Sequence, residues 1–162
     1  MIKTIRIPKD RVNVLKSCLR NIKEKTKTKI SVDENLIEIK GEALNVWKAK
    51  DIITAIGRGF SPMNSFLLLE DEKYLEVINL KTYTNTKKSI LRIKGRIIGK
   101  NGKCRKKIEN LTSSKISVYG HTVSIIADSG KIPEIKNAMT MLIKGMKHEK
   151  VYGYLRRVKK YD

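Results

Sequence analysis

The sequence predicts an α+β protein made of two tandem copies of one β-α-α-β-β-α unit, each a three-stranded antiparallel sheet packed by helices. A chain of 162 residues with 40% hydrophobic content can bury one ordinary core or two small ones. The sequence also aligns with itself without a gap at an offset of 86 residues. In each aligned segment, alternating and helical hydrophobic spacings follow one another in the same order, which indicates a duplicated fold.

The repeat is clearest at expected core positions. The aligned segments are Ile5-Arg6-Ile7 with Leu91-Arg92-Ile93, Lys29-Ile30-Ser31-Val32 with Lys115-Ile116-Ser117-Val118, Cys18 with Cys104, Ile22 with Ile108, and Thr26 with Thr112. A reducing cytosol and the lack of further cysteines favour two buried thiols over a disulfide between Cys18 and Cys104.

Each copy is expected to begin with a strand, at residues 4–7 and 90–94, followed by a helical segment. In copy two, Cys104, Ile108 and Leu111 form the apolar stripe of that helix. Strands at 115–119 and 122–127 flank a two-residue turn at Gly120-His121, which predicts a hairpin. Apolar spacing through residues 132–146 predicts the last helix. In copy one the last helix is expected at about 45–56, with Trp47 among its apolar residues.

These elements divide the chain into four parts. Residues 1–60 form the first copy, and residues 61–89 form a connection of a short helix, a strand at 74–80 and a polar linker. Residues 90–147 form the second copy, and residues 148–162 a basic, Tyr-rich tail. In the tail, Tyr152, Tyr154 and Tyr161 interleave with Lys and Arg, so it either stacks bases and contacts phosphates or extends a helix with a solvated basic face.

The charge of the chain points to a polyanionic partner. The formal net charge is +20 and the pI near 10.0, and residues 91–162 hold 18 basic and 5 acidic side chains. Nucleic acid is therefore the expected partner class. No apolar run approaches the roughly 18 residues of a membrane-spanning helix, and the N-terminus lacks the apolar stretch of a signal peptide. We expect a cytoplasmic protein with no membrane contact.

The segment Gly99-Lys100-Asn101-Gly102 places two glycines three positions apart between two helical turns. Glycine allows phosphates to approach backbone N–H groups closely, and the following helix N-terminus adds the positive end of its dipole. A glycine pattern alone could be a simple turn, but strand, helix, hairpin and final helix in this order are typical of a KH domain, which binds single-stranded RNA.

Around this loop we expect phosphate contacts and an apolar floor for the bases. The expected contacts, besides the loop itself, are Lys94, Arg96, Lys103, Arg105 and Lys106, with Ile97, Ile98 and Ile116 as the floor. Arg58, between two glycines, could equally contact a phosphate or fill a corner between helices.

Copy one has Asn13-Val14-Leu15-Lys16 where copy two has its glycine loop. The side chains of Val14 and Leu15 would hold a phosphate away from the backbone. We expect residues 1–60 to be a degenerate KH domain lacking GXXG, which packs against copy two or a protein partner and leaves RNA binding to copy two.

The arrangement resembles tandem type I KH proteins of the partner-of-Nob family, archaeal relatives of a eukaryotic small-subunit ribosome assembly factor. The segments that carry the resemblance are residues 55–62, 75–80, 96–103 and 151–155. The resemblance implies binding near the 3′ end of small-subunit (16S) rRNA, association with the endonuclease Nob, and a link to translation initiation factor two alpha. The sequence departs from the archaeal pattern in copy one, where a glycine-containing loop is expected.

Two other classes of function are an enzyme and a generic KH module in RNA decay or translation initiation. The sequence offers no clustered carboxylates for metal ions, no nucleophile with a base, and no Walker-type loop. His121 and His148 lack a nearby Cys, Asp or second His at ligand spacing. We therefore expect no catalytic activity, no metal and no cofactor.

Overall fold

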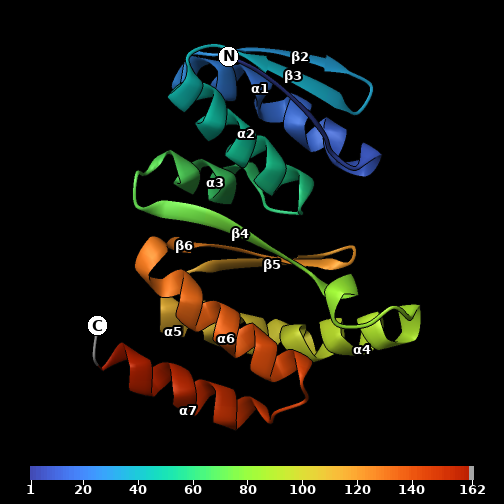
Figure 1. Ribbon diagram of the computed structural model, residues 1–162, viewed down its shortest axis with the longest axis vertical. Coiled ribbons are helices and arrows are strands. Elements are labelled where there is room, and N and C mark those ends of the chain that lie inside the picture. The colour runs from blue at the N-terminus through green and yellow to red at the C-terminus, as the bar shows by residue number, and fades with distance from the viewer. Residues whose placement is uncertain (161–162) are drawn as a thin grey trace. The chain divides into compact units, whose positions relative to one another are not determined.

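The computed structural model describes residues 1–160. The chain forms two compact units, Met1–Leu75 and the part from Glu76 onward. Each unit contains a three-stranded antiparallel sheet covered by helices (Figure 1). The predicted α+β class is therefore confirmed. Among the described residues, no helix is both long and apolar enough to cross a membrane.

The first unit consists of β1 (Ile2–Arg6), α1 (Val12–Thr26), β2 (Lys29–Asp33), β3 (Leu36–Lys40) and α2 (Ala43–Gly57), followed by α3 (Pro62–Ser65) and the short helix η2 (Phe66–Leu69). The sheet order is β1-β3-β2. Helices α1 and α2 pack against each other and against the sheet. Leu15, Ile22 and Ile53 are completely buried between these layers. Trp47, expected in this core, is instead 42% exposed, and Lys3 and Lys50 lie against its ring.

The second unit consists of β4 (Lys73–Asn79), α4 (Lys87–Ile98), α5 (Lys103–Thr112), β5 (Lys115–Tyr119), β6 (Thr122–Asp128), α6 (Ile132–Ile143) and α7 (His148–Lys159). The sheet order is β4-β6-β5. The hairpin predicted at Gly120-His121 is present, and it pairs Ser117 with Ser124 in antiparallel register. The backbone N–H of Leu80, just after β4, donates to the carbonyl of His121 at 2.8 Å.

The strand predicted at residues 90–94 is wrong, because this segment belongs to α4. Three residues of alternation cannot distinguish a strand from a helix. Leu91 is 66% exposed while Ile93 and Ile97 are buried, which is helical spacing. Thr86 begins the helix, since its side-chain oxygen accepts a hydrogen bond from the Ser89 N–H at 3.2 Å.

The strand expected within the connection at 61–89 exists, but it is β4, the first strand of the second sheet. Ile78 of this strand is buried in the core of the second unit. The expected tail is also part of that unit, because α7 packs on α5 and α6 and buries Val151, Tyr152 and Leu155. Tyr161, named in the sequence-based expectation for the tail, lies outside the described residues.

The predicted repeat is visible in matching local structure. Thr26 Oγ1 donates to the Ile22 carbonyl and lies 2.7 Å from Thr28 Oγ1. In the second unit, Thr112 Oγ1 donates to the Ile108 carbonyl and lies 2.7 Å from Ser114 Oγ. The same hydroxyl pair thus ends α1 and α5, and in both units a left-handed residue follows the helix. Cys18 and Cys104 are buried and unpaired, as predicted.

Candidate nucleic-acid interface

The glycine loop is the turn that joins α4 to α5. The N–H of Gly99 donates to the Gly95 carbonyl at 2.9 Å, and the N–H of Gly102 donates to the Gly99 carbonyl at 3.2 Å. Gly99 has φ +74°, Asn101 φ +56° and Gly102 φ +76°. Positive φ at three of four positions turns the chain sharply.

Gly99 is required by space as well as by backbone angle. A Cβ on Gly99 would lie 2.7 Å from Cys104 Cβ and 2.8 Å from the Cys104 backbone nitrogen. These atoms belong to the first turn of α5 and cannot move away without displacing the helix. A Cβ on Gly102 would meet no atom closer than 3.8 Å. At Gly102 only the backbone angle favours glycine, so the two glycines have different physical roles.

The N-terminus of α5 opens at this loop. Gly102 is the cap residue and provides no side-chain hydrogen bond, and the first turn of α5 contains no acidic residue. The first backbone N–H groups of a helix lack intrahelical acceptors and carry partial positive charge. Lys100 and Lys103 are exposed next to them. This combination suits a phosphate group.

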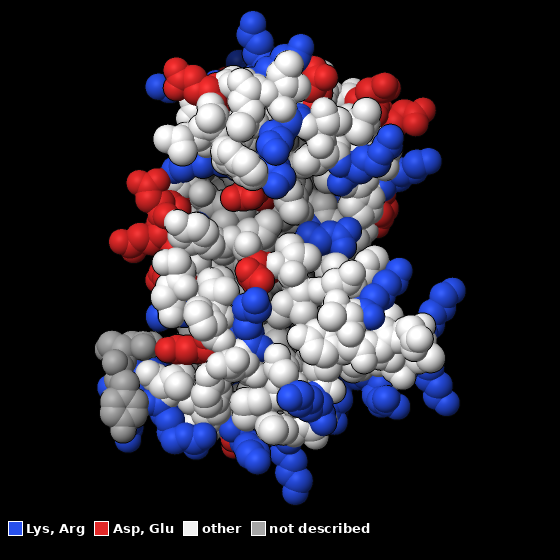
Figure 2. All heavy atoms as spheres, in the orientation of Figure 1, with Lys and Arg blue, Asp and Glu red and all other residues white. Residues whose placement is uncertain are grey.

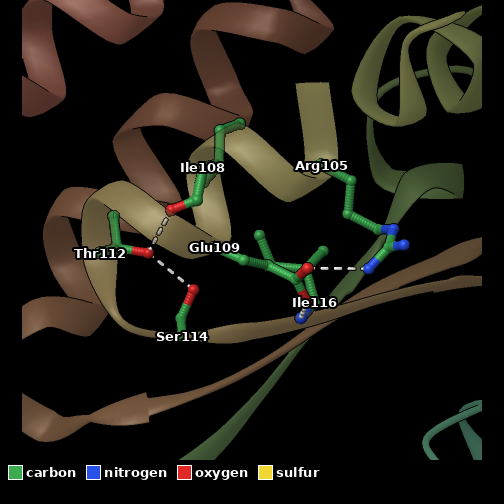
Figure 3. Close-up of polar contacts among 6 residues, drawn as sticks. All are labelled: Arg105, Ile108, Glu109, Thr112, Ser114 and Ile116. Carbon is green, nitrogen blue, oxygen red and sulfur yellow. Dashed lines mark hydrogen bonds and ion pairs between the residues drawn. The ribbon is translucent and has the colours of Figure 1, made fainter. Parts of the chain in front are cut away.

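Helix α5 has three faces with different tasks. Cys104 and Ile108 point into the core. Arg105 and Glu109 lie on the face toward β5, where Arg105 Nη1 donates to Glu109 Oε1 at 2.9 Å. The second carboxylate oxygen of Glu109 accepts a hydrogen bond from the Ile116 backbone N–H at 2.8 Å (Figure 3). Because β5 is an edge strand, Glu109 occupies a donor that a base could otherwise reach.

The third face of α5 is turned toward α7. Lys103, Lys106 and Lys107 lie on this side and border a cleft whose opposite wall is α7. The sequence alone does not separate these lysines from Arg105, because all belong to one basic run. The structure sends them to different sides of the helix.

Arg96 has an internal role in the structure. Its guanidinium donates to the carbonyls of Leu142 at 3.1 Å and Met146 at 2.8 Å. The Arg96 carbonyl in turn bonds His148 Nε2 at 2.9 Å. The first unit repeats the arrangement, since Arg11 donates to the carbonyls of Ile56 and Phe60. Arg96 thus ties the end of α6 to α4, and its contact with RNA stays a prediction.

The other predicted contact residues differ in exposure. Ile97 and Ile116, expected as part of the apolar floor, are buried in the core, so their side chains support the site from below. Ile98 is half-buried and Lys94 is half-buried on α4. Arg58 is half-buried at the end of α2, in the first unit. Loop residues, Ile98, Lys103, Arg105 and Lys106 remain accessible to a ligand.

From the sequence, Tyr152 either stacks on bases or belongs to a helix extension. The structure places it in helix α7. Tyr152 is 7% exposed. Burial raises the pKa of both its hydroxyl and the neighbouring Cys104 thiol. Tyr152 is therefore neutral and packed against α5. Tyr154 accepts a hydrogen bond from Asn137 Nδ2 at 3.1 Å.

Positive charge dominates the surface of the second unit. On the face shown in Figure 2, Lys and Arg side chains gather over α4 and along α7. Within the described residues, no group of three or more His, Cys, Asp and Glu could hold a metal ion. The surface is thus suited to an anionic ligand.

The sheet order, the helix pair and the glycine turn of the second unit define a KH domain. The family model of the second KH domain of PNO1, described as "Eukaryotic type KH-domain (KH-domain type I)", matches residues 74–160. The chain is 42% identical to a KH domain-containing protein of Methanocaldococcus jannaschii, over 96% of this chain and 73% of that protein. The chain belongs to the PNO1, or partner-of-Nob, family of KH-domain proteins.

Relatives and solved structures support this membership. Pre-rRNA-processing protein PNO1 of Chaetomium thermophilum is 30% identical over 84% of this chain, which spans only 52% of that protein. Dim2p of Pyrococcus horikoshii is 40% identical, with a TM-score of 0.91 over 97% of this chain and 99% of that one. Dim2p in a complex with a/eIF2alpha and rRNA from the same organism gives a TM-score of 0.93 over 100% of this chain and 96% of that one.

Proposed function

We propose that this protein is a ribosome assembly factor that binds single-stranded RNA near the 3′ end of small-subunit (16S) rRNA and has no catalytic activity. The observation that carries the proposal is the loop Gly99–Gly102, where left-handed backbone, absent side chains and the free N-terminus of α5 coincide. Its support from relatives is that PNO1 proteins are named for pre-rRNA processing and that the Pyrococcus complex contains rRNA.

In this proposal the loop holds the sugar-phosphate backbone and the surface between α4, α5 and β5 holds the bases. Phosphates approach the loop N–H groups because Gly99 and Gly102 carry no side chain. Lys100 and Lys103 add charge. Ile98 and the Arg105–Glu109 pair lie toward the bases, where aliphatic contact and hydrogen bonding select among them.

The proposal extends to the first unit and to partners. We propose that both units are type I KH domains and that the first is a degenerate copy, since α1 runs without interruption through Asn13–Lys16. In this proposal the protein binds rRNA without cutting it and positions the RNA for a partner endonuclease, Nob. Translation initiation factor two alpha is a second proposed partner, supported by the a/eIF2alpha present in the Pyrococcus complex.

The decisive experiment measures binding of a fluorescent 16S rRNA 3′-end fragment and of an unrelated single strand of equal length. The wild-type protein should prefer the rRNA fragment, whereas equal affinity would favour a generic KH module in RNA decay or translation initiation. The variant K100D/N101D should abolish binding, because carboxylates replace the groups that face the phosphates.

The first unit offers a matched control. The variant N13D/K16D makes the same two kinds of substitution at the two exposed positions of the aligned α1 segment, residues 13–16. It changes the net charge equally but touches no glycine loop. We expect its affinity to stay within about twofold of wild type. An equal loss in both variants would show that only total charge matters and would overturn the assignment of the loop.

A further inference from the structure

The cleft between α5 and α7 lies on the side of α5 away from the Arg105–Glu109 pair. It measures about 770 Å³, within the range of roughly 300–1,000 Å³ found for ligand sites. Its lining begins at the glycine loop with Lys100 and Asn101 and reaches Asn110 on α5. From Lys103 to Asn110 this is about 11 Å along the helix, at 1.5 Å per residue.

Cations line this cleft in excess. Of the residues that the structure describes, Lys100, Lys103, Lys106, Lys107 and Arg156 border it, against one carboxylate, Glu149. Within residues 1–160, Lys100, Lys103 and Lys106 form no ion pair. On the opposite face of α5, Glu109 already neutralises Arg105. The unpaired charge of α5 is thus concentrated on the α7 side, and an anion in this cleft would relieve repulsion among the lysines.

The lining also indicates which part of a nucleic acid would enter. Among the described residues, Tyr152 is the aromatic residue of the lining, and it is 7% exposed with Lys107 Nζ 5.9 Å from its ring centroid. The part of the lining within residues 1–160 therefore offers no open aromatic face to a base. Lysine ammonium groups bind phosphates as point charges without reading sequence.

We propose that the α5–α7 cleft is a second RNA site, which holds the phosphates of the nucleotides that flank those bound at the glycine loop. The proposal rests on the function proposed above. Because the cleft and the loop share Lys100 and Asn101, one RNA strand can pass from the loop into the cleft without leaving positive charge. The site adds affinity that depends on salt and not on sequence.

Two double variants test the cleft, and each removes one Lys and one Arg. K107Q/R156Q takes charge out of the cleft lining. K150Q/R157Q takes the same charge from exposed positions of α7 that do not line the cleft. Neither changes the glycine loop. Both should therefore bind the shortest RNA that the wild-type protein binds and K100D/N101D does not.

That shortest RNA is found by truncating the 16S rRNA 3′-end fragment, and it is then extended at its 5′ or 3′ end. The extensions are about six uridines, the same number of abasic ribose phosphates, or a polyethylene glycol spacer without phosphates. At one of the two ends, uridines and abasic phosphates should each improve wild-type binding on the order of tenfold at 0.1 M salt. The spacer should give no gain.

The variants decide what produces the gain. K107Q/R156Q should lose most of it and lower the log-log salt slope by about 1.4, at 0.7 per lost contact. K150Q/R157Q should keep the gain. No gain at either end, or equal losses in the two variants, would overturn the proposal. A polyglutamate peptide that competes with RNA through Lys107 and Arg156, while RNA extension brings no gain, would also overturn the proposal. The cleft would then bind acidic protein.

The two proposals fail in different ways. If K100D/N101D retains binding of the truncated RNA, the assignment of the loop is wrong. If that variant loses binding while extensions bring no gain, the loop is correct and the cleft is not an RNA site.

Discussion

The two units share their supporting contacts and differ where a phosphate would bind. Arg11 donates to two carbonyls at the end of α2, and Arg96 donates to two carbonyls at the end of α6. The Thr26–Thr28 hydroxyl pair has its counterpart in Thr112–Ser114. Yet α1 is continuous, whereas the second unit breaks its helix at Gly99 and restarts it at Lys103.

This difference shows that the fold does not require the glycine loop. The core residues and helix ends of the first unit are formed without it. Gly99 and Gly102 carry backbone angles that other residues adopt at a cost of about 1–3 kcal/mol each. A turn that restricts two positions to glycine, and that the first unit forms its fold without, is best explained by its ligand. The comparison can be tested by changing the loop, the shared arginines and the position where the two helices differ most in charge.

The largest effect is expected for Gly99→Ala. The new Cβ would lie 2.7 Å from Cys104 Cβ at a backbone angle of +74°, so the start of α5 must shift. We expect a loss of about 3 kcal/mol in the free energy of unfolding of the second unit. RNA binding should fall at least tenfold, measured by fluorescence anisotropy.

Gly95→Ala is the matched control for that variant. Gly95 lies inside α4, and a Cβ there meets no atom within 4 Å. The helix should gain about 0.5–1 kcal/mol. If Gly99→Ala cost no more stability than Gly95→Ala, the close approach to Cys104 would not be what requires glycine at position 99.

Next come the two arginines. Arg96→Ala and Arg11→Ala each leave two partly buried carbonyls without a charged donor, so each should destabilise its own unit by about 2–3 kcal/mol. Hydrogen exchange followed by mass spectrometry reads each unit separately. Lysine cannot restore the two-pronged contact. A variant Arg96→Lys with full stability but weaker RNA binding would contradict the internal role and return Arg96 to the RNA surface.

A smaller effect is expected at Glu109, which aligns with Lys23 of the first unit. Glu109→Lys removes the acceptor of the Ile116 N–H and the partner of Arg105. We expect a loss of about 2 kcal/mol, and faster hydrogen exchange at Ile116. Glu109→Gln keeps one acceptor and should lose about half as much. Unchanged exchange at Ile116 in the lysine variant would show that this carboxylate does not hold β5.

The sequence by itself determined the repeat, the loop and most of the core. An offset of 86 residues brings Cys18 onto Cys104 and Ile22 onto Ile108, and both pairs are buried. These features are local or periodic, so spacing reveals them. The hairpin at Gly120-His121 was predictable for the same reason.

The tertiary structure alone decided which basic residues face outward and which strand completes the second sheet. Alternation over residues 90–94 fits both a strand and a helix, and β4 pairs with β6 across more than forty residues of chain. Arg96 and Lys103 look alike in one basic run, but only Arg96 meets the carbonyls at the end of α6. The destination of a charged side chain depends on which backbone groups converge on it in space, and sequence spacing does not record that convergence.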